Sequence, residues 1–243
     1  MRIDKDYWLL NKPVAHRGLW GKEIVENSLS AYKNAAERGL PIEIDVYLTT
    51  DGKIVSFHDA ELKRMTGADG KIYEKTYAEL SELNLSESSE KIPLLDEVLS
   101  IAENKSPLLI EIKNQPNKKI VDRLVEKLKN YKGEFAVQSF NPLYIKRVKK
   151  LAPEFIRGIL ATSYKPNTKD KSAFTRWVLK YMPFNFLIKP DFISYNYHGL
   201  PLPKRKTKNK AVIAWTVTDQ QTADKIKPFC NNIIFEHFLP DNI

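Results

Sequence analysis

Short apolar runs alternate along the chain with segments whose apolar residues repeat at helical spacing. Each apolar run has the length of a buried strand, and strands separated by helices favour a mainly parallel sheet. We expect strands over residues 13–16, 41–48, 53–57, 107–113, 134–138, 155–160, 191–195, 211–217 and 232–236. Helical periodicity predicts helices over residues 28–38, 95–104, 118–131, 141–151 and 219–229. About eight such units predict an α/β protein with a single (β/α)8 TIM barrel.

The first predicted helix has both an apolar face and residues suited to its two ends. Asn27 is suited to cap the amino terminus, and Gly39 is suited to end the helix. The residues expected on its buried face are Leu29, Tyr32, Ala35 and Ala36.

Two longer segments interrupt the strand–helix rhythm. Residues 59–94 are polar and rich in Ser and Glu, which predicts a small insertion after the second strand. Residues 161–189 form a second insertion. Neither segment has the composition of a linker, so we expect one barrel domain over residues 1–243 with insertions at about 59–94 and 161–189.

The composition is that of an ordinary globular protein, with 42% apolar and 28% charged residues, which excludes disorder as the dominant state. Cys230 is the only cysteine, so no internal disulfide can form. The apolar segment near the amino terminus is too short for a signal peptide, and no window is long enough to span a membrane. These features predict a soluble, cytoplasmic protein.

The formal net charge of +9 favours an anionic partner. Phosphate-bearing small molecules, lipid head groups and nucleic acids all satisfy that condition.

Acidic residues alternate with apolar residues on two of the predicted strands. Glu43 and Asp45 share one face of one strand, and Glu111 and Lys113 share one face of another. Buried carboxylates pair with cations or bind metal, because an unpaired buried charge costs several kcal/mol. All-oxygen ligands suit Mg²⁺, Mn²⁺ or Ca²⁺. The alternative is that Glu43 and Asp45 lie on an exposed edge while Glu111 only pairs with Lys113.

Two histidines end predicted strands. His16 is followed by Arg17, and His58 is followed by Asp59. The carboxyl ends of barrel strands converge on one mouth, where two histidines can serve as general base and general acid. A purely structural, hydrogen-bonding role is the alternative for each of them.

Six short motifs occur in a characteristic order, and together they cover nearly the whole chain from residue 14 to about 236. They are His16-Arg17-Gly18, Glu26-Asn27-Ser28, Glu43-Ile44-Asp45, His58-Asp59, Glu111-Ile112-Lys113 and Gln138-Ser139-Phe140. In this order and spacing the chain resembles the glycerophosphodiester phosphodiesterase family. The resemblance implies a (β/α)8 barrel with a small insertion after its second strand.

The resemblance also implies roles for individual residues. Glu43, Asp45 and Glu111 would hold one divalent cation (Mg²⁺, Ca²⁺ or Mn²⁺). His16 and His58 would be the catalytic acid–base pair. The substrate-binding residues would be Arg17, Lys113, Asn27, Gln138 and Trp215.

The implied reaction is metal-dependent hydrolysis of a glycerophosphodiester to an alcohol and glycerol 3-phosphate. One histidine takes a proton from the nucleophile, which in the family's proposed route is the glycerol 2-hydroxyl, and the other protonates the departing alkoxide. This route gives a cyclic phosphate that water then opens. The partner is a small molecule, and no partner protein is implied. The chain departs from the family at its last strand, where it has Phe235-Glu236-His237 in place of the usual Thr-Asp pair, with Glu236 a candidate replacement for the Asp.

Two basic segments leave other functions open. Residues 174–188 combine aromatic residues at helical spacing with cations, as in a helix that contacts a membrane peripherally, and lysophospholipids would then be candidate substrates of a lysophospholipase D-type activity. We favour the ordinary alternative, a lid that packs this aromatic stripe on the barrel, because such stripes usually belong to the core. Residues 204–210 carry five cations, which suits a non-catalytic nucleic-acid-binding barrel. We favour a solvated helix end, because no aromatic residue is interleaved to stack on bases.

Overall fold

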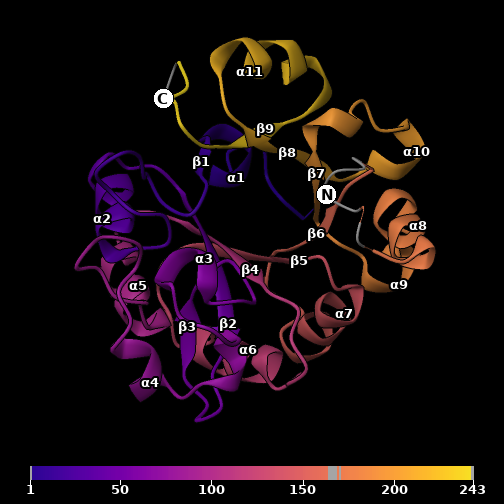
Figure 1. Ribbon diagram of the computed structural model, residues 1–243. Coiled ribbons are helices and arrows are strands. Elements are labelled where there is room, and N and C mark those ends of the chain that lie inside the picture. Colours follow the sequence, from indigo (N-terminus) through magenta and orange to yellow (C-terminus); the bar gives the residue numbers. More distant parts are fainter. Residues whose placement is uncertain (1, 164–168, 170, 242–243) are drawn as a thin grey trace. The chain divides into compact units, whose positions relative to one another are not determined.

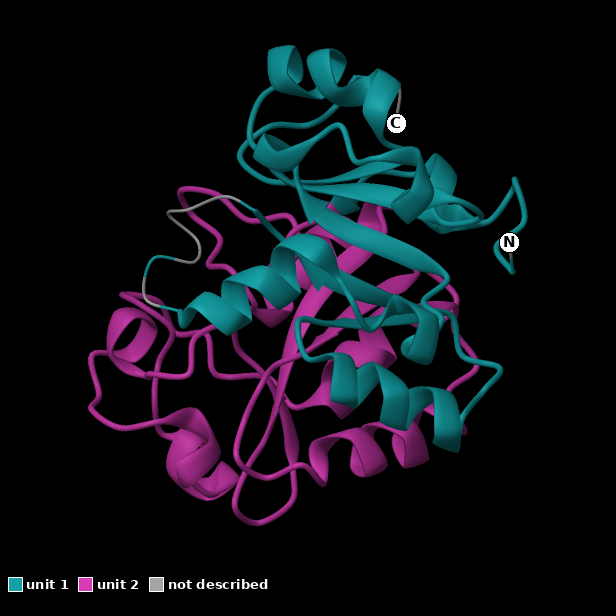
Figure 2. Ribbon diagram, turned by 90° about the vertical axis from the view of Figure 1, so that its right-hand side faces the viewer, with its two compact units in different colours: residues 1–14, 136–243 teal, residues 15–135 magenta. Residues whose placement is uncertain are grey.

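The computed structural model describes residues 2–163, 169 and 171–241. It divides the chain into two compact units, drawn in different colours in Figure 2. Unit 2 comprises residues 15–135, and unit 1 comprises residues 1–14 together with 136–243. Each unit has its own elements and hydrogen-bonded strands (Figure 1).

Of the parallel strands that the structure describes, unit 2 contains the first three. In chain order its elements are β1 (Val14–Ala15), α2 (Leu29–Glu37), β2 (Ile42–Leu48), β3 (Ile54–Ser56), α3 (Lys63–Thr66), η1 (Ile72–Glu74), α4 (Tyr77–Ser81), α5 (Leu95–Ala102), β4 (Leu108–Ile112) and α6 (Ile120–Leu128). Strand β2 pairs in parallel with β1 and with β4. All seven residues of β2 are buried, as expected for a strand that is covered on both faces.

The register between β2 and β4 decides where the acidic side chains lie. Asp45 is opposite Glu111, and Glu43 is opposite Leu109. Side chains alternate across a strand, so Glu43, Asp45 and Glu111 all lie on the same face of this sheet.

Helix α2 confirms the first predicted helix but corrects both of its ends. Its amino-terminal cap is Ser28, whose hydroxyl accepts a hydrogen bond from the Ala31 amide, and not Asn27. Asn27 has a positive φ of 53°, so the chain has not yet entered the helix there. At the other end Arg38 is the cap, and Gly39, at φ 64°, follows it in the left-handed region.

The predicted insertion at 59–94 is a folded segment with a core of its own. It contains α3, η1 and α4, and its buried side chains form a cluster with residues of β2 and β3. The buried members are Tyr47, Val55, Phe57, Leu62, Met65, Ile72, Leu80, Leu85 and Ile92. Strand β3 pairs antiparallel with β2, so it is a hairpin partner and not a strand of the parallel series.

Unit 1 contains the remaining strands and helices. They are α1 (Trp8–Asn11), β5 (Phe135–Ser139), α7 (Pro142–Leu151), β6 (Arg157–Ala161), α8 (Ala173–Tyr181), α9 (Asn185–Ile188), β7 (Phe192–Asn196), η3 (Tyr197–Gly199), α10 (Lys204–Thr207), β8 (Ala211–Val217), α11 (Gln220–Ile226), η4 (Lys227–Phe229) and β9 (Asn232–Phe235). Strands β5 to β9 pair in parallel, each with the next along the chain.

Over the described residues the two units hold eight parallel strands separated by helical segments, the order of a (β/α)8 TIM barrel, which confirms the predicted fold class. All nine predicted strands are present, with ends shifted by two residues or fewer. That residues 1–243 form a single domain stays a prediction. Within the same described part of the chain, every helix is too short or too polar to cross a membrane.

Candidate active site

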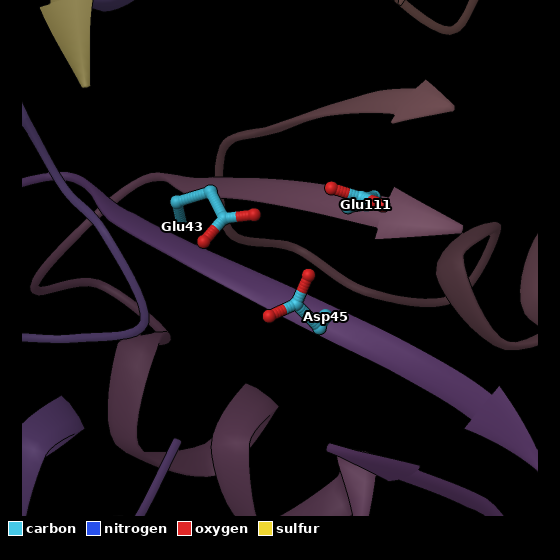
Figure 3. Close-up of side chains that lie close together, drawn as sticks. All are labelled: Glu43, Asp45 and Glu111. Carbon is cyan, nitrogen blue, oxygen red and sulfur yellow. The ribbon is translucent and has the colours of Figure 1, made fainter. Parts of the chain in front are cut away.

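Three carboxyl groups meet on the face shared by β2 and β4 in unit 2. Glu43, Asp45 and Glu111 each offer one oxygen, and these oxygens all lie within 4.8 Å of one another. Figure 3 shows the three groups facing a common space from two neighbouring strands. All three side chains are buried, so the alternative that Glu43 and Asp45 lie on an exposed edge is wrong.

Lys113 offsets part of this negative charge. Its ammonium group lies 2.9 Å from Glu111 Oε1 and donates to Asp45 Oδ1 at 3.2 Å. Burial alone would lower the pKa of Lys113, but the carboxylates of Asp45 and Glu111 outweigh it and raise that pKa. Burial alone would likewise raise the pKa of Asp45, yet Lys113, His58, Arg17 and His16 hold it well below its usual range.

Glu43 is the least compensated member of the cluster. Burial, followed by repulsion from Asp45 and Glu111, raises the pKa of Glu43 well above its usual value. A divalent cation among these oxygens would remove that repulsion. The cluster therefore fits the oxygen-only coordination that Mg²⁺, Mn²⁺ and Ca²⁺ prefer.

The His16-Arg17-Gly18 motif forms a tight turn directly after β1. Arg17 and Gly18 have φ angles of 59° and 85°, both in the left-handed region. This turn directs the Arg17 amide to Glu43 Oε2 at 3.1 Å and brings His16 Nε2 to 4.0 Å from the same oxygen. A Cβ atom at Gly18 would lie 2.8 Å from backbone and side-chain atoms of Ala31, which explains why glycine is required there.

Arg17 joins the turn to two further acids. Its Nη1 donates to Glu26 Oε1 at 2.7 Å, and its Nε lies 3.7 Å from Asp45 Oδ2. That Nε is buried and has no hydrogen-bond partner among the described residues. The arginine therefore holds an N–H group close to the carboxyl cluster that a bound anion can use.

His58 reaches this cluster in a way that the sequence pattern did not predict. We expected it at the carboxyl end of a parallel barrel strand, but β3 runs antiparallel to β2, and Ser56 is opposite Val46. The hairpin thus carries the chain back along β2 toward Asp45, whose pKa both histidines help to lower.

A network of ion pairs holds His58 in place. Its Nδ1 lies 2.6 Å from Asp59 Oδ1, and Asp59 also accepts a hydrogen bond from Arg64 Nε. Arg64 Nη2 donates to Glu26 Oε1 at 2.6 Å, and the same oxygen binds Arg17. Neither Arg64 nor Glu26 has a role predicted from the sequence, although Glu26 lies in one of the motifs. Together they connect His58 to the Arg17 turn.

Hydrogen bonds to both polar atoms of its side-chain amide fix the orientation of Asn27. Its Nδ2 donates to Asp45 Oδ2 at 3.1 Å, and its Oδ1 accepts from the Tyr32 hydroxyl at 2.8 Å. Ser56 hydrogen-bonds to the Tyr32 hydroxyl and donates to the Asp45 carbonyl. Asn27 therefore orients a cluster carboxylate. Tyr32 is buried as predicted, but its hydroxyl belongs to this polar network.

The other predicted substrate-binding residues lie in unit 1. Gln138 is buried on β5 and accepts a hydrogen bond from the Ser194 hydroxyl at 2.6 Å. Trp215 lies on β8, and its ring meets Phe140 edge-on with 5.6 Å between centroids. Unit 2 by itself thus brings together His16, Arg17, Asn27, Glu43, Asp45, His58, Glu111 and Lys113.

The family model for the glycerophosphoryl diester phosphodiesterase family matches residues 16–238. The chain belongs to this family. The predicted membership and the predicted enzyme class, a phosphoric diester hydrolase, are thereby confirmed.

Two relatives and one solved structure illustrate the similarity to this family. A glycerophosphodiester phosphodiesterase of Caldanaerobacter subterraneus subsp. tengcongensis is 35% identical over 161 residues, which are 60% of this chain and 65% of the relative. A second, from Bacillus altitudinis, is 29% identical over 230 residues, which are 92% of this chain and 87% of that protein. The structure of an Oleispira antarctica phosphodiesterase in complex with the product sn-glycerol-3-phosphate matches with a TM-score of 0.76 and 26% identity over 93% of this chain and 92% of that one.

Replacing Gly18 should disrupt the turn on which this family site depends. In Gly18→Ala the new methyl group meets the Ala31 backbone in a left-handed conformation, so we expect a loss of about 1–3 kcal/mol in the free energy of unfolding. Urea denaturation measures this loss. The matched control is Gly21→Ala, where a Cβ meets no atom within 4 Å and the change should stay within about 0.5 kcal/mol. Equal stability of the two variants would contradict this account of the turn.

Proposed function

We propose that this protein hydrolyses glycerophosphodiesters to glycerol 3-phosphate and an alcohol in a metal-dependent reaction with His16 and His58 as the acid–base pair. The observation that carries the proposal is the buried Glu43, Asp45 and Glu111 cluster with one cation, Lys113, inserted in it. The similarity to named glycerophosphodiester phosphodiesterases supports the choice of substrate class. A product complex of sn-glycerol-3-phosphate with a structural relative agrees with it.

Glu43, Asp45 and Glu111 would hold the divalent cation. When bound, the cation supplies positive charge that offsets the charge of a phosphodiester monoanion, which otherwise repels nucleophiles.

Arg17 and Lys113 would contact the phosphate. Lys113 has three N–H donors, of which two are directed at Asp45 and Glu111, so one is left for an anion. The Nε group of Arg17 is a second donor. Both contacts strengthen as negative charge accumulates on the phosphoryl oxygens in the transition state.

The two histidines would move the protons of the reaction. One accepts the proton of the attacking glycerol 2-hydroxyl as the new P–O bond forms, and the other gives a proton to the alkoxide as the old P–O bond breaks, which leaves a cyclic phosphate. Water then opens this cyclic phosphate to glycerol 3-phosphate. Asp59 binds Nδ1 of His58, so the other ring nitrogen, Nε2, is left for the substrate. Asp59 is therefore a positioning residue.

Asn27 would support the site by orienting Asp45, and Gln138 and Trp215 would bind the substrate. The indole nitrogen of Trp215 is a buried donor without a hydrogen-bond partner among the described residues. A hydroxyl of the glycerol moiety can accept from it, which supports the predicted role.

Adding a divalent cation should stabilise the protein measurably. At a concentration about 100 times the Kd, binding stabilises a folded protein by about 2.7 kcal/mol, or roughly 5–10 °C in Tm for a chain of this size. Differential scanning fluorimetry with EDTA followed by Mg²⁺, Mn²⁺ or Ca²⁺ measures the shift. Asp45→Asn and Glu43→Gln should abolish it, whereas Glu126→Gln, an exposed acid on α6, should keep it.

The same measurement separates a metal site from a structural ion cluster. In EDTA, Glu43→Gln should be at least as stable as the natural protein, because it removes a buried, poorly compensated charge. A marked destabilisation of Glu43→Gln without metal would assign the cluster a structural role.

His16→Ala and His58→Ala should each lower kcat about a hundredfold or more. Neither histidine belongs to the carboxyl cluster, so both variants should retain the Tm shift with the divalent cation. Near-normal turnover in a variant with an intact metal response would exclude that histidine from the acid–base pair.

The direct test of the proposed function is release of glycerol 3-phosphate from glycerophosphocholine and glycerophosphoethanolamine. We expect hydrolysis that EDTA abolishes and that one of the three cations restores. No turnover with any of them would overturn the proposal, and release of choline or ethanolamine from lysophospholipids alone would replace the substrate class.

A further inference from the structure

Helix α8 in unit 1 has a buried side and an aromatic exposed side. Leu179 and the capping residue Met182 are buried, and Met182 packs in a core cluster with residues of α7, β6 and β7. Phe174, Trp177 and Tyr181 follow one another at helical spacing on the outside and are 66%, 47% and 45% exposed. The expectation that the whole aromatic stripe packs as a lid is therefore wrong for these three, which we name the aromatic row.

The aromatic row is continuous. The rings of Phe174 and Trp177 stack with 6.1 Å between centroids, and those of Trp177 and Tyr181 are 6.4 Å apart. The next helix, α9, exposes Phe186 even further, at 77%. Surface hydrophobic residues are common one at a time, but a contiguous group of this kind marks an interaction surface.

Cations from neighbouring segments surround the row. Lys180 and Lys206 lie 5.2 and 5.0 Å from the Tyr181 ring centroid, and Lys206 of α10 also donates to the Lys180 carbonyl at 2.9 Å. On the α9 side, Lys149 of α7 donates to the Leu187 carbonyl at 2.9 Å. Helices α7 to α10, coloured from red-brown to orange in Figure 1, thus supply both the apolar and the basic groups.

The positive charge of the whole chain originates in this segment. Residues 141–210 contain 16 Lys and Arg against 3 Asp and Glu, whereas the rest of the chain contains 23 against 27. One of the three acids, Asp191, is buried and accepts a hydrogen bond from the Arg157 amide. The cations of this segment therefore greatly outnumber its acids, and most of their charge is not neutralised within the segment.

The pKa values of two lysines in this segment reflect repulsion among its cations. Partial burial, followed by repulsion from Arg205 and Lys180, lowers the pKa of Lys206. Desolvation, followed by repulsion from Lys189, Arg157 and Lys146, lowers the pKa of Lys149. A nearby anionic surface would relieve this repulsion.

We propose that the aromatic row and the cations around it bind an anionic phospholipid bilayer peripherally. Aromatic rings partition into the interface between head groups and acyl chains, and Lys and Arg beside them bind anionic head groups. The row matches a bilayer better than it matches single-stranded nucleic acid, because two ammonium groups already lie over the Tyr181 ring that a base would stack on. Figure 1 places α8 and α9 among the outer helices of unit 1.

Vesicle sedimentation tests this proposal. The full chain should pellet at low ionic strength with phosphatidylcholine vesicles that contain about one third phosphatidylglycerol, and only weakly with pure phosphatidylcholine. Salt should reduce the binding, since part of it is electrostatic. Tryptophan emission should shift to shorter wavelength on binding, as Trp177 leaves water.

Two paired variants distinguish the aromatic from the basic contribution. Phe174→Ser with Trp177→Ser should lower the partition coefficient at least about tenfold and remove the emission shift. Arg176→Gln with Lys180→Gln should lower the dependence on phosphatidylglycerol. The matched control is Phe229→Ser on η4. Phe229 is 45% exposed, close to the 47% of Trp177, and its variant should bind as the natural chain does.

Several outcomes would overturn the proposal. One is that a chain with its normal Tm does not pellet with the vesicles. The others are equal pelleting with and without phosphatidylglycerol, and unchanged binding by the variant Phe174→Ser with Trp177→Ser. Retention on single-stranded RNA without vesicle binding would assign the surface to nucleic acid. A concentration-dependent dimer that the same double variant dissociates would assign it to a second copy of the chain. Each measurement is independent of catalysis, so failure of the proposed function would not affect it.

Discussion

Three buried carboxyl groups within 4.8 Å of one another impose the constraint on which the rest of unit 2 depends. Like charges at this distance in a buried site repel strongly, and each loses hydration as well. The protein holds them through the register of β2 and β4, which is itself set by fully buried strands and so resists slipping. Lys113 compensates Asp45 and Glu111, and Glu43 is left with a raised pKa. An arrangement that costs stability in this way is typical of a site kept for binding or chemistry.

The surrounding residues serve to orient the cluster and the histidines. Asn27 binds Asp45, the Arg17 amide binds Glu43, and Asp59 binds His58. Arg17 and Asn27 both adopt left-handed backbone conformations, which are uncommon outside glycine and are concentrated at functional sites. Fixed donors and acceptors are what an enzyme needs to stabilise developing charge without reorganisation during the reaction.

Charged residues are distributed unevenly along the chain. The carboxyl cluster depends on negative charge, whereas the surface around the aromatic row depends on positive charge. The carboxyl cluster in unit 2 lies in a region rich in acids, and its own negative charge is what a divalent cation would neutralise. Residues 141–210 in unit 1 carry the cationic excess and also expose the aromatic row. The net charge of +9 is thus the sum of a basic segment in unit 1 and a more acidic remainder that contains the carboxyl cluster. For a protein whose proposed substrate is an anion, the overall positive field would also favour encounter.

From the amino-acid sequence alone one can predict the strand–helix order, the alternation that sets Glu43 and Asp45 on one strand face, and the family motifs. These depend on local periodicity and spacing, which the chain carries directly. Tertiary structure decided that β3 folds back as a hairpin, that Ser28 and not Asn27 caps α2, and that Arg64 reaches Glu26, 38 residues away along the chain. It also decided which side of α8 is buried, because periodicity shows that a helix has an apolar side but not how much of that side its neighbours cover. Contacts between residues distant in the sequence arise from packing, so no local pattern contains them.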